Sequence, residues 1–235
     1  MMGGLMPRVG AIIVAAGASQ RMEGVDKMFA PLLGRPLLAW TVAAFEASSA
    51  VDEIVVAVHR STIQQARELA RQEGWRKVSQ VCRGGPRRQD SVREALWRLG
   101  KCDWVAVHDG ARPCIEPELL ACGLAAARET GAAAPGLPLH DTVKRTDAGG
   151  TVVETLDRSG LWLIQTPQVF RYAILWDAYR QAGGDATDDA ALVERLGHGV
   201  KLFPGSFRNI KVTVPADLEA ASEYLGSREA RKSGS

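Results

Sequence analysis

A chain of 235 residues is long enough to bury a substantial core without disulfides or a structural metal. Its hydrophobic fraction of 46% and charged fraction of 24% are typical of a globular protein. A net charge of only +2 argues against a general nucleic-acid-binding or membrane-surface protein, and no apolar run approaches the roughly 18 residues of a membrane span.

The four cysteines do not form a recognisable metal or redox motif. No two of them have C-x-x-C spacing, and no His-x-x-x-His pair accompanies them. This usage favours a reduced, cytoplasmic protein. Residues 10–17 are apolar but short and follow a single Arg8, so we interpret them as part of a strand rather than as a signal peptide.

Strand-like and helix-like segments alternate along the first 140 residues. Residues 9–15 form a continuous β-branched apolar run, as a strand buried on both faces requires. Ser91-Val-Arg-Glu94 has the capping-box pattern and is predicted to open a helix. The expected strands are 9–15, 54–58, 78–82, 104–108 and 132–139, and the expected helices are 36–48, 62–72, 91–99 and 116–129. Such repeated units predict an α/β fold, with a mostly parallel Rossmann-like sheet and helices on both faces.

The pattern changes between residues 140 and 168. Two β-prone runs, 142–146 and 151–156, flank the turn Asp147-Ala-Gly-Gly150. They predict a β-hairpin inserted at about 140–160, which is expected to protrude as an arm. Arms of this kind often contact a partner subunit.

The last third returns to alternating elements. Helices are expected at 171–181, 188–196 and 216–225, and strands at 200–203 and 210–214. The polar tail at 227–235 is expected to be disordered. Since neither an internal repeat nor a linker is visible, residues 1–235 are predicted to form a single domain.

The loop after the first strand is the strongest local motif. It reads Ala15-Ala-Gly-Ala-Ser-Gln-Arg21-Met22 and is followed by Lys27. Small residues after a buried strand let phosphate oxygens approach backbone N–H groups, and Arg21 and Lys27 supply positive charge. The loop has neither the G-K-[ST] of a Walker A motif nor the glycine spacing of a dinucleotide fingerprint, which disfavours a dehydrogenase.

Five ordered blocks carry a resemblance to a known family. They are A-A-G-x-x-x-R-M with a following Lys (15–27), G-G-x-x-R-x-x-S-V (84–92), V-H-D-x-A-R-P (107–113), D-T-V-K with D-R-x-x-L-W and T-P-Q (141–168), and N-I-K-V-T (209–213). Together they span roughly residues 8–225, where the chain resembles the 2-C-methyl-D-erythritol 4-phosphate cytidylyltransferases of the non-mevalonate isoprenoid pathway. The chain departs from the family pattern at Gly110, where Ala is frequent, and at Pro86, where an acidic or small residue is common.

The resemblance implies a nucleotidyltransferase sheet, a Mg²⁺-dependent (or other divalent-cation-dependent) reaction, and a homodimer whose arm completes the neighbouring site. The implied partners are CTP and a methylerythritol phosphate, and the low net charge predicts neither a nucleic-acid nor a membrane partner. The implied catalytic residues are Arg21, Lys27 and Lys211. The implied nucleotide-binding residues are Ala15, Ala16, Gly17, Gly85, Ser91 and Gly110. The implied substrate-binding residues are Asp109, Arg112, Thr142, Arg158 and Thr166, and Asp109 is also the expected metal ligand.

These residue types suit the attack of a phosphate monoester on the α-phosphorus of CTP. A phosphate monoester, with a second pKa of about 6, is largely dianionic near neutral pH and needs no protein base. The reaction instead needs cations that let one anion approach another. Arg21, Lys27 and Lys211 supply such charge, and Asp109, following the strand at 104–108, is placed to hold Mg²⁺.

Plainer interpretations remain open for several residues. Ser91, Asp188 and Asp189 are also good helix caps, and Arg158 is also a good surface ion-pair partner. His108, His140 and Cys114 are interpreted as structural, because none has a ligand-spaced partner. Two other functions are also open: an enzyme that makes CDP-ribitol or another CDP-polyol, and a non-catalytic nucleotide-binding regulator.

Overall fold

The apolar runs at 9–15 and 104–108 become neighbouring strands in the middle of one sheet. The computed structural model describes residues 7–17, 26–181 and 183–233. β1 (Val9–Ala15) pairs in parallel with β4 (Glu53–Val58) and with β6 (Trp104–Asp109), and β4 pairs in parallel with β5 (Val78–Arg83). These parallel strands confirm the predicted α/β fold.

The other half of the sheet is mixed. β11 (Gln168–Arg171) runs antiparallel between β6 and β7 (Ala132–Pro138), and β10 (Trp162–Ile164) also pairs antiparallel with β7. β12 (Lys201–Pro204) pairs in parallel with β7 on its other side. The order is therefore β10-β7-β11-β6-β1-β4-β5, with β12 beside β7. β10 and β11 are not predictable from sequence, because neither short segment has a clear apolar alternation.

Helices cover both faces of the sheet, as predicted. Alternate residues of β1 belong to two different apolar clusters: Ala11 and Ile13 to one, Ile12 and Val14 to the other. The first cluster contains buried residues of α1 (Leu37–Ala47), α2 (Ile63–Gln72), α4 (Pro117–Thr130) and α7 (Pro215–Ser233). The second contains buried residues of α3 (Arg88–Leu96), α5 (Tyr172–Gln181) and α6 (Asp189–Arg195).

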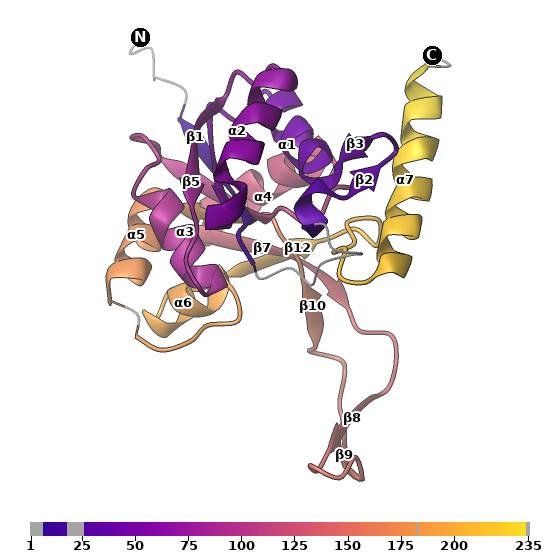
Figure 1. Cartoon of the computed structure of the whole chain (residues 1–235). Coiled ribbons are helices and arrows are strands. Elements are labelled where there is room, and N and C mark those ends of the chain that lie inside the picture. Colours follow the sequence, from indigo (N-terminus) through magenta and orange to yellow (C-terminus); the bar gives the residue numbers. More distant parts are fainter. Residues whose placement is uncertain (1–6, 18–25, 182, 234–235) are drawn as a thin grey trace.

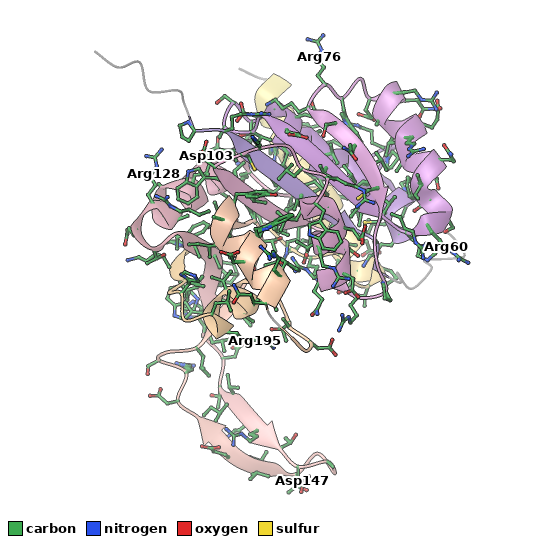
Figure 2. The ribbon with its side chains drawn as sticks, turned by 90° about the vertical axis from the view of Figure 1, so that its left-hand side faces the viewer. Arg60, Arg76, Asp103, Arg128, Asp147 and Arg195 are labelled. Atoms are coloured by element: carbon green, nitrogen blue, oxygen red, sulfur yellow. The ribbon has the colours of Figure 1, made fainter. Side chains whose placement is uncertain are left out.

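The predicted hairpin is present and projects away from the sheet (Figure 1). β8 (Val143–Thr146) pairs antiparallel with β9 (Val152–Leu156), and Figure 2 shows Asp147 at the far end of this arm. The side chain of Asp147 accepts hydrogen bonds from the N–H groups of Gly149 and Thr151, both at 2.9 Å, which closes the turn.

Three local expectations were wrong. α3 begins at Arg88, because the Asp90 carboxylate accepts from the Arg87 N–H at 3.3 Å and caps the helix one turn before Ser91. Residues 210–214 form no strand, since Val212 N–H bonds to a single loop carbonyl, that of Ala111, at 2.8 Å. The tail is helical as far as Ser233, because α7 continues beyond the packed Ala221 and Leu225.

Four short elements complete the described chain. A 3-10 helix, η1 (Lys27–Phe29), is followed by the two-residue pair β2 (Pro31–Leu32) and β3 (Arg35–Pro36). A second 3-10 helix, η2 (Arg60–Thr62), precedes α2. None of the helices that the structure describes is both long enough and apolar enough to cross a bilayer.

Candidate active site

A cavity lies where β1 and β6 end. It is lined by Val14, Ala15, Gly17, Lys27, Met28, Arg88, Asp109, Ala111 and Lys211. The lining includes five of the residues predicted from sequence, which come from the loop after β1, η1, β6 and the segment before α7. The carboxyl ends of parallel strands are where α/β proteins place their ligands.

Three cationic side chains surround the carboxylate of Asp109 at this cavity. Its Oδ1 accepts from Arg88 Nε at 2.9 Å, and its Oδ2 lies 2.9 Å from Lys211 Nζ and 3.9 Å from Arg112 Nε. The Asp109 side chain is only 10% exposed, whereas Lys211 is 44% exposed. One buried carboxylate therefore holds three cationic side chains at the end of one strand.

Burial and neighbouring charges together set the pKa values of Asp109 and Lys27. Burial alone disfavours the charged form of Asp109, but Arg88 and Lys211 more than compensate, so its pKa lies well below the usual range. Burial lowers the pKa of Lys27, and the nearby charge of Lys211 lowers it further. A bound polyanion would relieve this repulsion between the two lysines, so the free cavity is electrostatically suited to phosphate groups.

Local hydrogen bonds hold the cationic residues in place. Asp26 caps η1 by accepting from the Met28 N–H at 2.9 Å, which fixes the turn that carries Lys27. Asn209 Nδ2 donates to the carbonyl oxygen of Thr166 at 2.8 Å, and this contact anchors the segment that carries Lys211. Lys211 is therefore held by side-chain contacts to its loop rather than by the strand expected from sequence.

Thr166 is buried next to Asp109, and its hydroxyl group links the Asp109 backbone to His108 by hydrogen bonds. The Asp109 N–H donates to Thr166 Oγ1 at 3.0 Å, and Thr166 Oγ1 lies 3.0 Å from His108 Nδ1. His108 Nε2 lies 3.2 Å from the Arg112 carbonyl oxygen, which can only accept, so Nε2 carries the proton and Nδ1 accepts from the hydroxyl. Burial lowers the pKa of His108 to about 3. His108 is thus a neutral structural residue, as expected, and both of its ring nitrogens are occupied.

The predicted Gly85 and Ser91 do not line this cavity, but they flank Gly84, where the loop after β5 meets the loop after β1. The Gly85 N–H donates to Ser91 Oγ at 3.1 Å. A Cβ atom on the preceding Gly84 would lie 2.2 Å from Ala16 Cβ and 2.7 Å from Ser91 Oγ. Gly84 is therefore required for the two loops to approach each other.

Gly84→Ala is expected to lower the free energy of unfolding by about 1–3 kcal/mol, because the added methyl group overpacks this junction. It should also raise the KM for CTP, since the loops must separate at the predicted nucleotide contacts. Chemical denaturation and steady-state kinetics check both effects. Gly183→Ala is the matched control, because nothing lies within 4 Å of the added atom. Equal behaviour of the two variants would contradict the prediction.

The other predicted residues fall into three groups. Gly110 and Arg112 lie behind the cavity: the Gly110 N–H donates to the Val14 carbonyl at 2.8 Å, and Arg112 Nη1 donates to the Asn209 carbonyl at 2.7 Å. Thr142 and Arg158 are exposed residues of the arm segment, where Arg158 contacts the His140 carbonyl, and neither lines the cavity of its own chain. Arg21 lies outside the described residues.

Arg88 was not assigned a role from sequence, although it is the arginine of the G-G-x-x-R-x-x-S-V block. Its guanidinium joins Asp109 to Asp189, with Nη1 2.8 Å from Asp189 Oδ2. Asp188 caps α6, as expected, by accepting from the Ala191 N–H at 2.9 Å. Asp189 does not cap the helix but forms this buried ion pair. This motif contains Arg88, but the partners of Arg88 are 21 and 101 residues away in sequence, so the motif could not show them.

The donor groups of the cavity fit a divalent ion only in part. Among the residues that the structure describes, no group of three or more His, Cys, Asp or Glu side chains could hold a metal. Asp109 is the one carboxylate among the described residues that line the cavity, and both of its oxygens already contact cations. Mg²⁺ often takes one or two carboxylates and completes its shell with substrate phosphates and water. The site therefore fits an ion that takes most of its ligands from a nucleotide.

The parallel strands, the small-residue loop and the cationic cavity define an α/β enzyme of the nucleotidyltransferase class. The family profile described as "IspD: 2-C-methyl-D-erythritol 4-phosphate cytidylyltransferase" matches residues 9–227. The chain belongs to this family.

Relatives and solved structures agree over nearly the whole chain. A 2-C-methyl-D-erythritol 4-phosphate cytidylyltransferase of Dehalococcoides mccartyi (strain CBDB1) is 48% identical over 221 residues, which is 94% of this chain and 97% of the relative. The crystal structure of 2-C-methyl-D-erythritol 4-phosphate cytidylyltransferase from Thermus thermophilus has a TM-score of 0.77 at 33% identity, covering 94% and 99% of the two chains. A 4-diphosphocytidyl-2C-methyl-D-erythritol synthase from Anaerococcus prevotii has a TM-score of 0.81 at 27% identity, covering 94% and 96%.

Proposed function

We propose that the chain transfers the CMP group of CTP to 2-C-methyl-D-erythritol 4-phosphate, giving 4-diphosphocytidyl-2-C-methyl-D-erythritol and pyrophosphate. The observation that carries the proposal is the convergence of Lys27, Arg88 and Lys211 on the Asp109 cavity in a chain of this family. The names of the relatives supply the acceptor and the product. A cytoplasmic setting goes with this function and with four free cysteines.

In the proposed reaction a phosphate oxygen of the acceptor attacks the α-phosphorus of CTP. The bond from that phosphorus to its bridging oxygen breaks, and pyrophosphate leaves with the bond electrons. The acceptor phosphate is already largely dianionic near neutral pH, because its second pKa is about 6. No residue that lines the described cavity is a histidine or cysteine, so the lining residues act by charge and position rather than by proton removal.

The charged residues of the site then act on the phosphate groups in the following ways. Lys27 binds the triphosphate as it gains charge in the transition state, and Arg21 is proposed to do the same from the preceding loop. Lys211, the most exposed partner of Asp109, moves its ammonium group from the carboxylate to a phosphate oxygen. Mg²⁺, or another divalent cation, would neutralise phosphate charge when bound, and Asp109 would be its carboxylate ligand among the described residues.

The test is pyrophosphate release from CTP and Mg²⁺ with a panel of polyol phosphates. We expect the highest kcat/KM with 2-C-methyl-D-erythritol 4-phosphate and little release when EDTA removes the metal. A preference for ribitol phosphate would instead make the chain a CDP-polyol enzyme. Tight CTP binding without pyrophosphate release, with every acceptor, would make it a nucleotide-binding regulator.

We also propose that the chain forms a homodimer in which the arm of one subunit reaches the cavity of the other. A two-stranded hairpin is marginally stable alone in water, yet β8 and β9 project from the sheet with Val153 65% exposed (Figure 1). The strand at the base of the arm, β10, also exposes Leu163. Thr142 and Arg158 lie on this arm segment and would act in trans.

A complementation assay tests this arrangement. Lys27→Ala and Arg158→Ala should each be inactive alone, because each removes one contributor to every site. After the two variants are mixed and exchange subunits, about a quarter of the sites regain both residues under random C2 pairing, so about a quarter of the activity should return. Sedimentation velocity gives the oligomeric state. Activity that stays absent in proven mixed dimers would place Arg158 in cis or outside the site.

A further inference from the structure

The guanidinium group of Arg88 connects a carboxylate in the cavity to a carboxylate on α6. Arg88 lies in the first turn of α3, and its Nε donates to Asp109 Oδ1 at 2.9 Å. Its Nη1 donates to Asp189 Oδ2 at 2.8 Å. Asp109 lines the cavity, whereas Asp189 does not. Arg88 thus holds one carboxylate inside the site and one outside it.

Asp189 is completely buried and is itself held from two sides. The Tyr179 hydroxyl, on α5, donates to Asp189 Oδ1. Gln168 Oε1, on β11, accepts from the Asp189 N–H at 3.2 Å and from the Ala190 N–H at 3.0 Å. The position of the Asp189 carboxylate is therefore set by a helix and a strand that do not touch the cavity.

The charges of this cluster are fixed by its burial and its partners. Burial opposes the charged form of Arg88, but Asp189 and Asp109 more than compensate, so its pKa is raised. Burial raises the pKa of Tyr179, and the Asp189 charge adds to that, so Tyr179 remains a hydroxyl donor. A buried charge that loses its partner is costly, so Arg88 must reorient or draw in water if Asp189 is neutralised.

We infer that Asp189 is a positioning residue for the transfer reaction, acting through Arg88 to fix the Asp109 carboxylate beside Lys211. This inference rests on the proposed function. Arg88 has no second acceptor for Nη1 besides Asp189 among the described residues, and its Nη2 is buried without a partner. Asp189 is thus what aligns the guanidinium, and the Asp109 contact follows from that alignment.

In Asp189→Asn we expect CTP binding and turnover to change in different ways. This change keeps the shape of the side chain but removes one negative charge near the cavity, so CTP, an anion, should bind with an unchanged or smaller Kd. Turnover should fall, because Asp109 and Lys211 lose their fixed geometry. Loss of an outer partner of this kind typically costs about 10–100-fold in activity, and we expect kcat to fall by that amount. If Asp189 had only a structural role, Asp189→Asn would lower the melting temperature of the protein but would not lower kcat while leaving CTP binding unchanged.

The experiment compares wild type, Asp189→Asn, Tyr179→Phe and Asp185→Asn. Asp185 is the control, because its carboxylate is 80% exposed and pairs with Arg87 instead of Arg88. Steady-state kinetics with CTP, calorimetric Kd for CTP and the melting temperature are measured for each. Lower kcat with unchanged or tighter CTP binding in Asp189→Asn, and neither change in Asp185→Asn, supports the inference. Unchanged kcat per folded Asp189→Asn molecule overturns it.

Two further measurements keep the test decisive. If Asp189→Asn does not fold, Tyr179→Phe retains both charges, and its kcat should fall about 2–10-fold for one lost hydrogen bond; an unchanged kcat overturns the inference. If the wild type uses no acceptor, the proposed function fails. The Arg88 Nε–H resonance, identified by its loss in Arg88→Lys, then reports on positioning: it should shift in Tyr179→Phe and not in Asp185→Asn, and no shift overturns the inference.

Discussion

Lys27→Ala is expected to lower kcat by about 10²–10³-fold, as the loss of one preorganised transition-state donor does. Lys27 lines the cavity from η1, and its ammonium group is partly desolvated there, which strengthens its interaction with phosphate charge. The effect should fall mainly on kcat, because the interaction grows as charge develops on the leaving pyrophosphate. Rapid-quench or steady-state assays of pyrophosphate release measure it.

Lys201→Ala is the matched control, since Lys201 pairs with Glu129 on an exposed surface, 2.8 Å away. It should retain wild-type kinetics.

Lys27→Arg gives a second comparison, in which the pH dependence of kcat/KM is measured. The pKa of Lys27 is lowered by burial and by Lys211, so the protonated, active form of the free enzyme is lost as pH rises through that lowered value. The arginine variant stays charged, and its kcat/KM should fall at higher pH than that of wild type. Near-normal activity of Lys27→Ala would refute the assigned role.

Asp109→Asn is expected to lower the free energy of unfolding by about 3–5 kcal/mol, because it leaves buried cations without their carboxylate. For a chain of this size that corresponds to a fall in melting temperature of about 6–20 °C. Arg88 and Arg112 are the partners most affected, since their side chains are 23% and 11% exposed. Turnover should fall as well, because Lys211 loses the carboxylate that positions its ammonium group.

The same residue gives a pH dependence of stability. The pKa of Asp109 in the folded chain lies below its unfolded value of about 3.9, because Arg88 and Lys211 overcome the effect of burial. Its contribution is therefore complete above the unfolded pKa and is lost as pH falls through the folded pKa. The stability difference between wild type and Asp109→Asn should be constant from pH 7 down to about pH 4 and should shrink only as pH falls further, toward the folded pKa of Asp109. A difference that does not shrink below about pH 4 would mean that the charge of Asp109 is not the cause.

The candidate site was only partly predictable from sequence. Ala15, Gly17, Lys27, Asp109 and Lys211 do line one cavity. Ala15, Gly17 and Asp109 lie at the ends of neighbouring parallel strands, which meet at one sheet edge, whereas Lys27 and Lys211 reach it from η1 and a loop. Thr142 and Arg158 could be named only through the resemblance, since nothing local shows where an arm reaches. Asp189 was read as a helix cap because its neighbours are typical of a cap, yet its carboxylate pairs with Arg88.

The sequence by itself determined the alternating α/β order, the buried central strands, the arm and the family, because apolar periodicity and short motifs are local properties. Only the tertiary structure decided that β11 enters antiparallel between β6 and β7 and that α7 extends to Ser233. It also decided that Arg88 joins Asp109 to Asp189. Pairings of this kind depend on which distant groups meet once the core has closed. A buried charge takes whatever opposite charge the packed elements bring to it, and no local pattern encodes that choice.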